Sequence, residues 1–204
     1  KRPVTLTSAT DSKQYDGEPL TNSEVTVSGE GWAKGEGFEH GATYDVTGSQ
    51  TIVGSSKNTF TYTLTGGASE DNYSITKVEG TLTVSNRDAQ YEVTVTAKSG
   101  SKTYDGTELA VSGFENEVEG KGIEVTAANG KTYYVSGLTS EAKGTDVKDS
   151  VASIAYEGTA VVKDADGNDV SEQFNVKVNP GSLTISKRPV TLTSATDSKQ
   201  YDGE

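Results

Sequence analysis

The chain has 204 residues, with 30 acidic and 18 basic side chains, one histidine, one tryptophan, no cysteine and no methionine. These counts exclude disulfides, thiol catalysis and cysteine-based metal sites, and the net charge of −12 disfavours nucleic acid or anionic lipid as a partner. No run of about 18 apolar residues is present, so we expect no insertion into a membrane. The missing methionine indicates a stretch cut from a longer protein, with any signal peptide or anchor outside it.

The pattern of apolar residues predicts β-strands. Hydrophobic residues make up only 31% of the chain, which raises disorder as an alternative. However, threonine alternates with valine, leucine or aromatic residues at 4–7, 60–65 and 93–96, and such residues fit a half-buried pleated sheet. Glycines lie mostly between these runs, where they indicate turns, and no stretch has a helical period. The sequence therefore predicts an all-β protein.

In chain order, the first half is expected to form short strands at residues 4–8, 24–28, 43–47, 59–65, 73–77 and 80–84. The second half repeats this order and adds a hairpin, in which residues 159–162 turn through 164–169. Several short strands in about 100 residues are typical of an immunoglobulin-like β-sandwich. We therefore predict two tandem Ig-like β-sandwich domains, with a β-grasp-like fold as the alternative, although no helix pattern of adequate length supports it.

The chain repeats itself on two levels. Residues 1–18 recur without change at 187–204, which indicates a tandem array of a 186-residue unit. Within this unit, the segment from Lys13 to Gly17 matches the segment from Lys102 to Gly106 at an offset of 89.

These repeats define the predicted domains. We place a first β-sandwich at 1–86, a second type with the extra hairpin at 87–186, and the truncated start of the next repeat at 187–204. The junctions near 86 and 186 are short and lack a Gly/Ser linker, which predicts limited motion between neighbours. The last 18 residues lack the rest of their own domain, and we expect them to pack weakly or fray.

Two motifs carry the internal repeat. They are Lys-x-Tyr-Asp-Gly at 13–17 and 102–106, and Asn-Tyr-x-Ile-x-x-x-x-Gly-Thr-Leu-Thr-Val at 72–84. Together they resemble the YDG/MBG-type repeats of very large bacterial cell-surface proteins, mostly from Gram-positive organisms. The second domain departs from this pattern, with Gln-Phe-Asn-Val at 173–176. The resemblance implies an extracellular, cell-wall-associated adhesin or stalk built of many copies, and it implies no catalytic residues.

Two functions of different classes follow from these observations. The first is a non-catalytic, monomeric, semi-rigid stalk that presents an adhesive region and has neighbouring repeats as its partners. The second is an adhesive module that binds host glycan, mucin or matrix protein through the Gly-rich stretch 29–41, with Trp32, Phe38 and His40 as ligand-binding candidates. Trp32 has a structural alternative, in which it packs beneath its own loop. An enzyme is not expected, because one histidine and no cysteine leave no nucleophile–base pair to assign.

Other candidate sites have structural explanations. Asp164, Asp166 and Asp169 are the best candidates for calcium ligands, but their spacing departs from the EF-hand loop and equally fits a hairpin turn, so we assign no metal and no cofactor. Tyr-Asp-Gly is interpreted as a tight turn with a packed tyrosine. Four residues are candidates for an isopeptide or ester cross-link, namely Lys13, Lys102, Asn72 and Gln173. The sequence assigns no acidic catalyst to them, so we predict no such bond.

Overall fold

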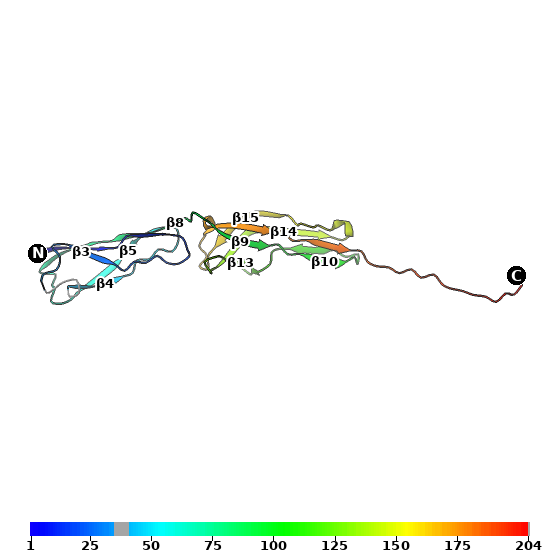
Figure 1. The fold of residues 1–204 in the computed structure, drawn as a ribbon, viewed down its shortest axis with the longest axis horizontal. Coiled ribbons are helices and arrows are strands. Elements are labelled where there is room, and N and C mark those ends of the chain that lie inside the picture. Colours follow the sequence, from blue (N-terminus) through cyan, green and yellow to red (C-terminus); the bar gives the residue numbers. More distant parts are fainter. Residues whose placement is uncertain (35–40, 204) are drawn as a thin grey trace. The chain divides into compact units, whose positions relative to one another are not determined.

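The computed structural model describes residues 1–34 and 41–203 (Figure 1). In these residues the regular structure is β-strand apart from two 3₁₀ turns, at Val147–Asp149 and Ser171–Gln173. The prediction of an all-β protein is confirmed, whereas the Ig-like arrangement stays a prediction. Over the same described ranges, no helix combines the length and apolarity needed to cross a membrane.

Packing divides the chain into two compact units. The first unit contains Lys1–Thr94, Val118–Ser136 and Ala160–Lys177. The second contains Val95–Glu117, Gly137–Thr159 and Val178–Glu204. These units group segments by packing, and the repeat boundaries near residues 86 and 186 stay predictions.

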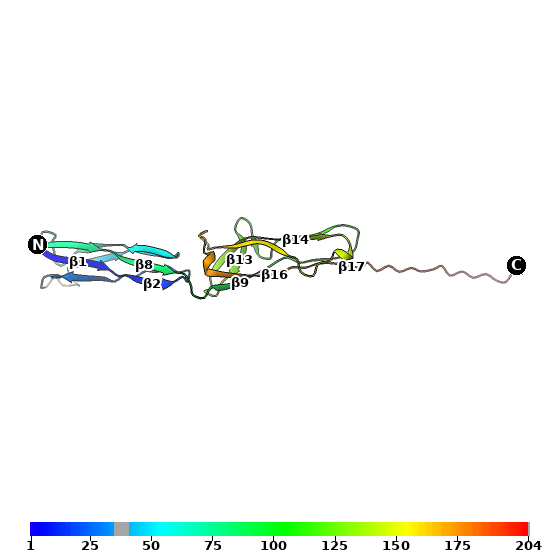
Figure 2. The same cartoon turned by 90° about the horizontal axis from the view of Figure 1, so that it is seen from above.

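The first 86 residues form three small sheets. Their strand orders are β3-β1-β7, β2-β8-β5 and β4-β6 (Figures 1 and 2). The pairs β1–β3, β5–β8 and β4–β6 are antiparallel, whereas β1–β7 and β2–β8 are parallel. The strands are β1 (Arg2–Ser8), β2 (Asp11–Gln14), β3 (Val25–Gly29), β4 (Ala42–Val46), β5 (Gly54–Asn58), β6 (Phe60–Leu64), β7 (Tyr73–Val78) and β8 (Gly80–Ser85).

The first and last strands of this segment run parallel over nearly their whole length. The pairing begins with Arg2 opposite Tyr73 in β1 and β7, and it ends with Gln14 opposite Ser85 in β2 and β8. Only residues 9–10 interrupt the first chain segment and residue 79 the second. The segment that enters this part of the fold is therefore paired side by side with the segment that leaves it.

The alternation of threonine with apolar residues explains the core of this segment. Successive side chains of a strand point to opposite faces, so Val4 and Leu6 in β1 are buried while the threonines that follow each of them are only partly covered. They pack with Val25, Phe60 and Tyr73 into one hydrophobic cluster. Burial of these apolar side chains is the main favourable term for the fold.

A buried polar group marks the place where strands pass from one sheet to the next. Ser8 Oγ donates to the carbonyl of Asn58 and accepts the N–H of Gly80 at 3.0 Å. Asn58 Nδ2 donates to the carbonyls of Ala9 and Asn22, at 3.0 and 2.9 Å. Gly80 approaches the facing backbone so closely that a Cβ there would lie 2.2 Å from the carbonyl oxygen of Ala9. The side chains of Ser8 and Asn58 thus supply hydrogen-bond partners to backbone groups where the chain passes from one sheet to the next.

The remaining strands repeat part of this pattern. β10 pairs with β17 in parallel, beginning with Gly100 opposite Leu183. The equivalent pair in β2 and β8 is Asp11 opposite Leu82, which lie 89 and 101 residues earlier, so the register is the same. β16 pairs with β9, and β11-β14-β13-β12 form a further sheet with β15 beside β14. The strands are β9 (Tyr91–Thr96), β10 (Gly100–Thr103), β11 (Leu109–Ser112), β12 (Glu117–Val118), β13 (Gly122–Thr126), β14 (Thr132–Gly144), β15 (Tyr156–Lys163), β16 (Phe174–Asn179) and β17 (Leu183–Ser186).

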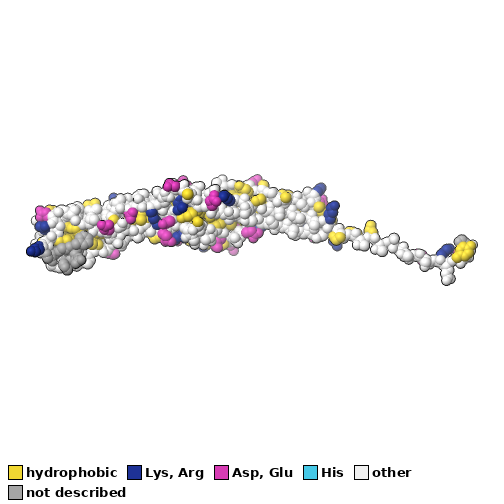
Figure 3. Space-filling model, in the orientation of Figure 1, with side chains coloured by type: hydrophobic (Ala, Val, Ile, Leu, Met, Phe, Trp, Pro, Cys, Tyr) yellow, Lys and Arg dark blue, Asp and Glu magenta, His cyan; other side chains and the backbone are white. Residues whose placement is uncertain are grey.

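The second copy of the 18-residue sequence has a different conformation from the first. Residues 187–203 contain no strand and their side chains are exposed, whereas residues 1–18 form β1 and β2. Leu6 is 0% exposed, while Leu192, its exact sequence equivalent, is 92% exposed. In the space-filling view, hydrophobic side chains of this segment are open to solvent (Figure 3). The acidic side chains on the same face are spread over the surface and form no single patch.

Candidate functional site

The motif Tyr15-Asp16-Gly17 forms a turn that its own residues hold in place. Gly17 has a φ of +80°, which favours glycine. Asp16 Oδ1 accepts the N–H of Glu18 at 2.8 Å and pairs with Lys13 Nζ at 2.7 Å, and this ammonium also donates to the Glu18 carbonyl. Lys13, Asp16 and Gly17 therefore each stabilise the turn locally, whereas the role of the tyrosine depends on other segments.

The second copy of the motif builds the same turn. Gly106 has a φ of +81°, and Asp105 Oδ1 accepts the N–H of Thr107 at 2.9 Å and pairs with Lys102 Nζ at 2.9 Å. Tyr104 N donates to the carbonyl of Ser186 at 2.8 Å, as Tyr15 N donates to that of Ser85 at 2.9 Å. Backbone and local side chains are thus matched in the two copies.

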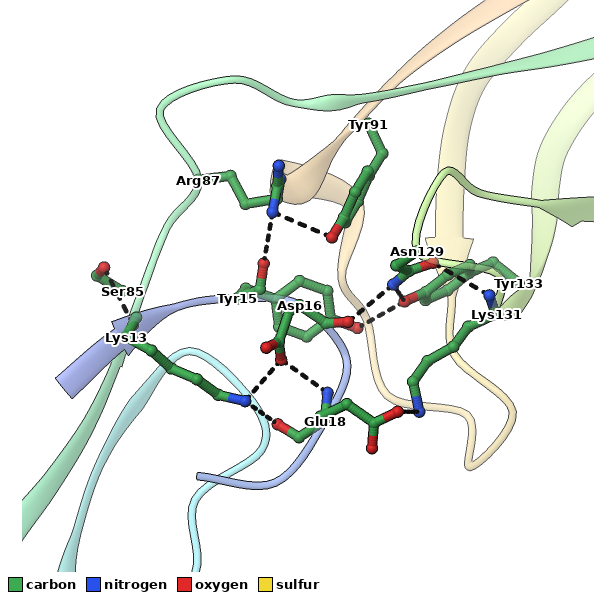
Figure 4. A network of polar contacts seen from close by, with 10 residues as sticks. All are labelled: Lys13, Tyr15, Asp16, Glu18, Ser85, Arg87, Tyr91, Asn129, Lys131 and Tyr133. Atoms are coloured by element: carbon green, nitrogen blue, oxygen red, sulfur yellow. Dashed lines mark hydrogen bonds and ion pairs between the residues drawn. The ribbon is translucent and has the colours of Figure 1, made fainter. Parts of the chain in front are cut away.

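The surroundings of the two tyrosines differ. Tyr15 is 1% exposed, and its hydroxyl shares a hydrogen bond of 3.4 Å with that of Tyr133 (Figure 4). Asn129 Nδ2 donates to the Asp16 carbonyl and to the Tyr133 hydroxyl, both at 2.8 Å. We call the whole group the Tyr15 cluster; its members are Lys13, Tyr15, Asp16, Glu18, Ser85, Arg87, Tyr91, Asn129, Lys131 and Tyr133.

Arg87 connects the cluster to the chain that follows β8. Its Nη1 donates to the Tyr15 carbonyl and to the Tyr91 hydroxyl, each at 3.0 Å, and its guanidinium lies 3.9 Å from the centroid of the Tyr91 ring. Such stacking of a cation on an aromatic face adds attraction beyond the hydrogen bonds. Close by, the buried Gln173 accepts the N–H of Arg87 at 3.0 Å and donates to Asn86 at 2.7 Å. Asn86 and Arg87, which lie between β8 and β9, therefore connect the segment Lys1–Thr94 of the first unit with its segment Ala160–Lys177.

The contacts within the cluster shift the pKa values of three of its members. Burial, and then the hydrogen bond to Tyr133, raise the pKa of Tyr15 above its ordinary value, so the hydroxyl keeps its proton to a higher pH than an exposed tyrosine does. Burial acts to raise the pKa of Asp16, but hydrogen bonds from Lys13 and from the Glu18 backbone outweigh it and lower this pKa. On the rim, Lys131 Nζ forms an ion pair with Glu18 at 2.9 Å, and this contact raises the pKa of Lys131. These groups are held in the charge states that their neighbours require.

Of the three candidate ligand-binding residues, the structure describes Trp32, while Phe38 and His40 lie outside the described residues. Trp32 is half-buried against the hydrophobic cluster described above, to which β1, β3, β6 and β7 contribute. It meets the Tyr73 ring edge to face, with 5.0 Å between ring centroids, and Ala33 N donates to the Tyr73 hydroxyl at 2.9 Å. Trp32 thus packs against the core of this segment. Its placement beneath its own loop and its ligand-binding role both stay predictions.

The acidic hairpin segment uses its carboxylates to shape the turn. Asp164 Oδ1 accepts the N–H groups of Asp166 and Asn168, at 3.0 and 2.8 Å. Asp169 Oδ1 accepts both the N–H and the hydroxyl of Ser171. In the described part of the chain, no three His, Cys, Asp or Glu side chains are grouped to hold a metal ion.

The sequence did not single out the residues that complete the Tyr15 cluster. Tyr133 lies 89 residues after Tyr44, and Arg87 has a counterpart in Arg188, so both belong to repeated segments, whereas Asn129 and Lys131 do not share this signal. They matter because the fold brings them to the Tyr15 turn, between 72 and 118 residues away along the chain. Comparison of the chain with protein-family models, with curated proteins and with solved structures gives no match.

Proposed function

We propose that the chain is a non-catalytic tandem-repeat segment of a bacterial cell-surface protein, and that it acts as a semi-rigid stalk. The observation that carries this proposal is the parallel pairing of the segment entering the first repeat, β1 and β2, with the segment leaving it, β7 and β8. The unchanged copy of residues 1–18 at 187–204 supports a tandem array. The resemblance of the motifs to YDG/MBG-type repeats supports a location at the outer face of the cell wall.

Parallel terminal strands suit a protein that is pulled at its two ends. Tension pulls β1 from its N-terminal end and β8 from its C-terminal end. Because the paired strands point the same way, this tension drags them past each other, and the hydrogen bonds of β1–β7 and β2–β8 are loaded together. If the strands were pulled apart from a shared end, the bonds would break one after another. β10 and β17 offer the same geometry in the second unit.

The Tyr15 cluster supports the semi-rigid character of the proposed stalk. Residues 86–90 join β8 to β9, and four of their side chains form hydrogen bonds to groups outside this connection. Arg87 is bonded to Tyr15, and Asn86 to the buried Gln173. A connection held in this way has fewer conformations available than a free linker.

Force spectroscopy with two attachment geometries tests the proposal. In the first, the 204-residue chain is held at its N-terminus and at Glu204→Cys; in the second, at its N-terminus and at Asn72→Cys. The chain has no native cysteine to compete for attachment. Arg2 N donates to the Asn72 carbonyl at 2.7 Å, so the second geometry peels β1 from β7 at their shared end.

We expect the first rupture to need at least about twofold more force in the end-to-end geometry, because forced unfolding depends on the barrier that the load must cross. Thermal melting of the two attachment variants serves as a control for folding. Equal rupture forces in the two geometries would contradict the mechanical role.

A further inference from the structure

We propose that the turn of Tyr104, Asp105 and Gly106 is a docking surface for the repeat that begins at Lys187. The expected occupant is a copy of the first repeat, which would cover Tyr104 as other segments cover Tyr15. The inference rests on the tandem array of the proposed function and is independent of the mechanical role.

The first step is the match between the two turns. Lys102, Asp105 and the residue after Gly106 reproduce the hydrogen bonds of Lys13, Asp16 and the residue after Gly17. The tyrosine N–H groups bond to equivalent serine carbonyls at the ends of β17 and β8. Local structure thus presents Tyr104 in the way that it presents Tyr15.

The second step is that the cover is present at one turn and missing at the other. Tyr104 is 38% exposed, against 1% for Tyr15. A Cβ on Gly17 would lie 2.7 Å from the Tyr133 hydroxyl and 2.8 Å from Lys131 Cδ, whereas a Cβ on Gly106 would meet nothing within 4 Å. The Tyr104 turn is therefore an open version of a turn that is covered elsewhere in the same chain.

The third step identifies the occupant. Arg188 follows Ser186 at the same spacing as Arg87 follows Ser85, and Arg87 donates to the Tyr15 carbonyl of the covered turn. Arg188 already lines a hollow with Tyr104, together with Lys187 and Val190 and with Val147, which is itself exposed. Residues 187–204 are identical to the start of the first repeat. Direct continuation into that repeat would place a folded domain beside the apolar patch of Tyr104 and Val147.

The test extends the chain and measures the exposure of one tyrosine. Residues 19–186 are appended after Glu204, with Tyr104→Phe in the appended copy so that the original Tyr104 gives a peptide of unique mass. Hydroxyl-radical footprinting then compares modification at Tyr104 in the 204-residue and the extended chains. Tyr156, which is 49% exposed, serves as the internal control. A chain extended with the same residues in scrambled order controls for added length.

Folding of the appended repeat is measured separately by the rate of tryptic cleavage after Lys199, because this bond becomes part of a strand when the repeat folds. We expect slow cleavage after Lys199 together with at least a fivefold drop in Tyr104 modification, with Tyr156 unchanged. Slow cleavage with Tyr104 still fully reactive would overturn the docking inference and leave the tandem array standing. Rapid cleavage after Lys199 would overturn both.

Discussion

At the scale of single residues, Gly17 and Gly106 occupy equivalent turns, but only Gly17 is also packed against a distant segment of the chain. Their φ angles are +80° and +81°, so replacing either with alanine imposes a similar backbone strain of about 1 kcal/mol. They differ in what surrounds them. At Gly17 the new methyl group would also displace the Tyr133 hydroxyl from its hydrogen bonds, whereas the space beside Gly106 is open.

We therefore expect Gly17→Ala to lower the free energy of unfolding by about 2–3 kcal/mol and Gly106→Ala by about 1 kcal/mol. Urea denaturation of the two variants beside the wild-type chain measures this difference. Equal losses would mean that the Tyr15 cluster adds no packing constraint at Gly17.

The buried Tyr15 hydroxyl should make the free energy of unfolding fall as the pH rises in the alkaline range. Its pKa is raised in the folded chain, so folded protein keeps this proton where unfolded protein loses it. The contribution is complete below the unfolded pKa of about 10 and declines as pH rises above it. Between pH 9 and about pH 11, the wild-type chain should lose about 1 kcal/mol more than Tyr15→Phe.

Denaturation curves at these two pH values measure the effect, with Tyr104→Phe as the matched control because Tyr104 is exposed. If Tyr15→Phe loses as much stability with rising pH as the wild-type chain, the hydroxyl is not protected in the folded state.

At the scale of elements, the sequence located the apolar strands well. The predicted strands at 4–8, 73–77 and 80–84 correspond to β1 (Arg2–Ser8), β7 (Tyr73–Val78) and β8 (Gly80–Ser85). β2 (Asp11–Gln14) and β5 (Gly54–Asn58) were missed, since they carry polar residues in place of alternating apolar ones. They are strands because each pairs with β8, and such tertiary pairing outweighs weak local preference.

The close approach of Gly80 to the backbone at the end of β1 leads to a prediction. A methyl group there would collide with backbone, at 2.2 Å from the Ala9 carbonyl oxygen and 2.5 Å from that of Ser8, and backbone cannot move aside as a side-chain end can. Gly80→Ala should lower the free energy of unfolding by about 3 kcal/mol. Urea denaturation measures this loss beside Gly167→Ala, where the space is open and only the backbone strain of a φ of +88° costs about 1 kcal/mol. A loss at Gly80 no larger than that at Gly167 would contradict the collision.

At the scale of the whole molecule, one 18-residue sequence occurs both folded and unpaired. Residues 1–18 contribute two strands, and residues 187–203 contribute none. In the first copy, β3, β7 and β8 supply the hydrogen-bond partners. Strand formation by this sequence thus depends on the segments it pairs with.

Trypsin should distinguish the two copies. The bond after Lys199 has the same neighbours in sequence as the bond after Lys13, but Lys13 lies in β2 and is paired with β8. Cleavage requires local opening of a strand, so we expect cleavage after Lys199 to be about 100-fold faster. Fragment masses over a time course give both rates. Comparable rates would show that residues 187–204 are held by contacts as firm as those of the first copy.

The sequence by itself determined the all-β class, the repeats and the turn at Tyr-Asp-Gly, because alternation, self-similarity and positive-φ glycines are local signals. Tertiary structure alone decided that the terminal strands pair in parallel and that one motif tyrosine is buried while its copy is exposed. Arg87, Asn129 and Tyr133 reach Tyr15 from distant positions in the chain. Side-chain burial and strand pairing depend on which distant segments come into contact, and a local sequence pattern does not specify those contacts.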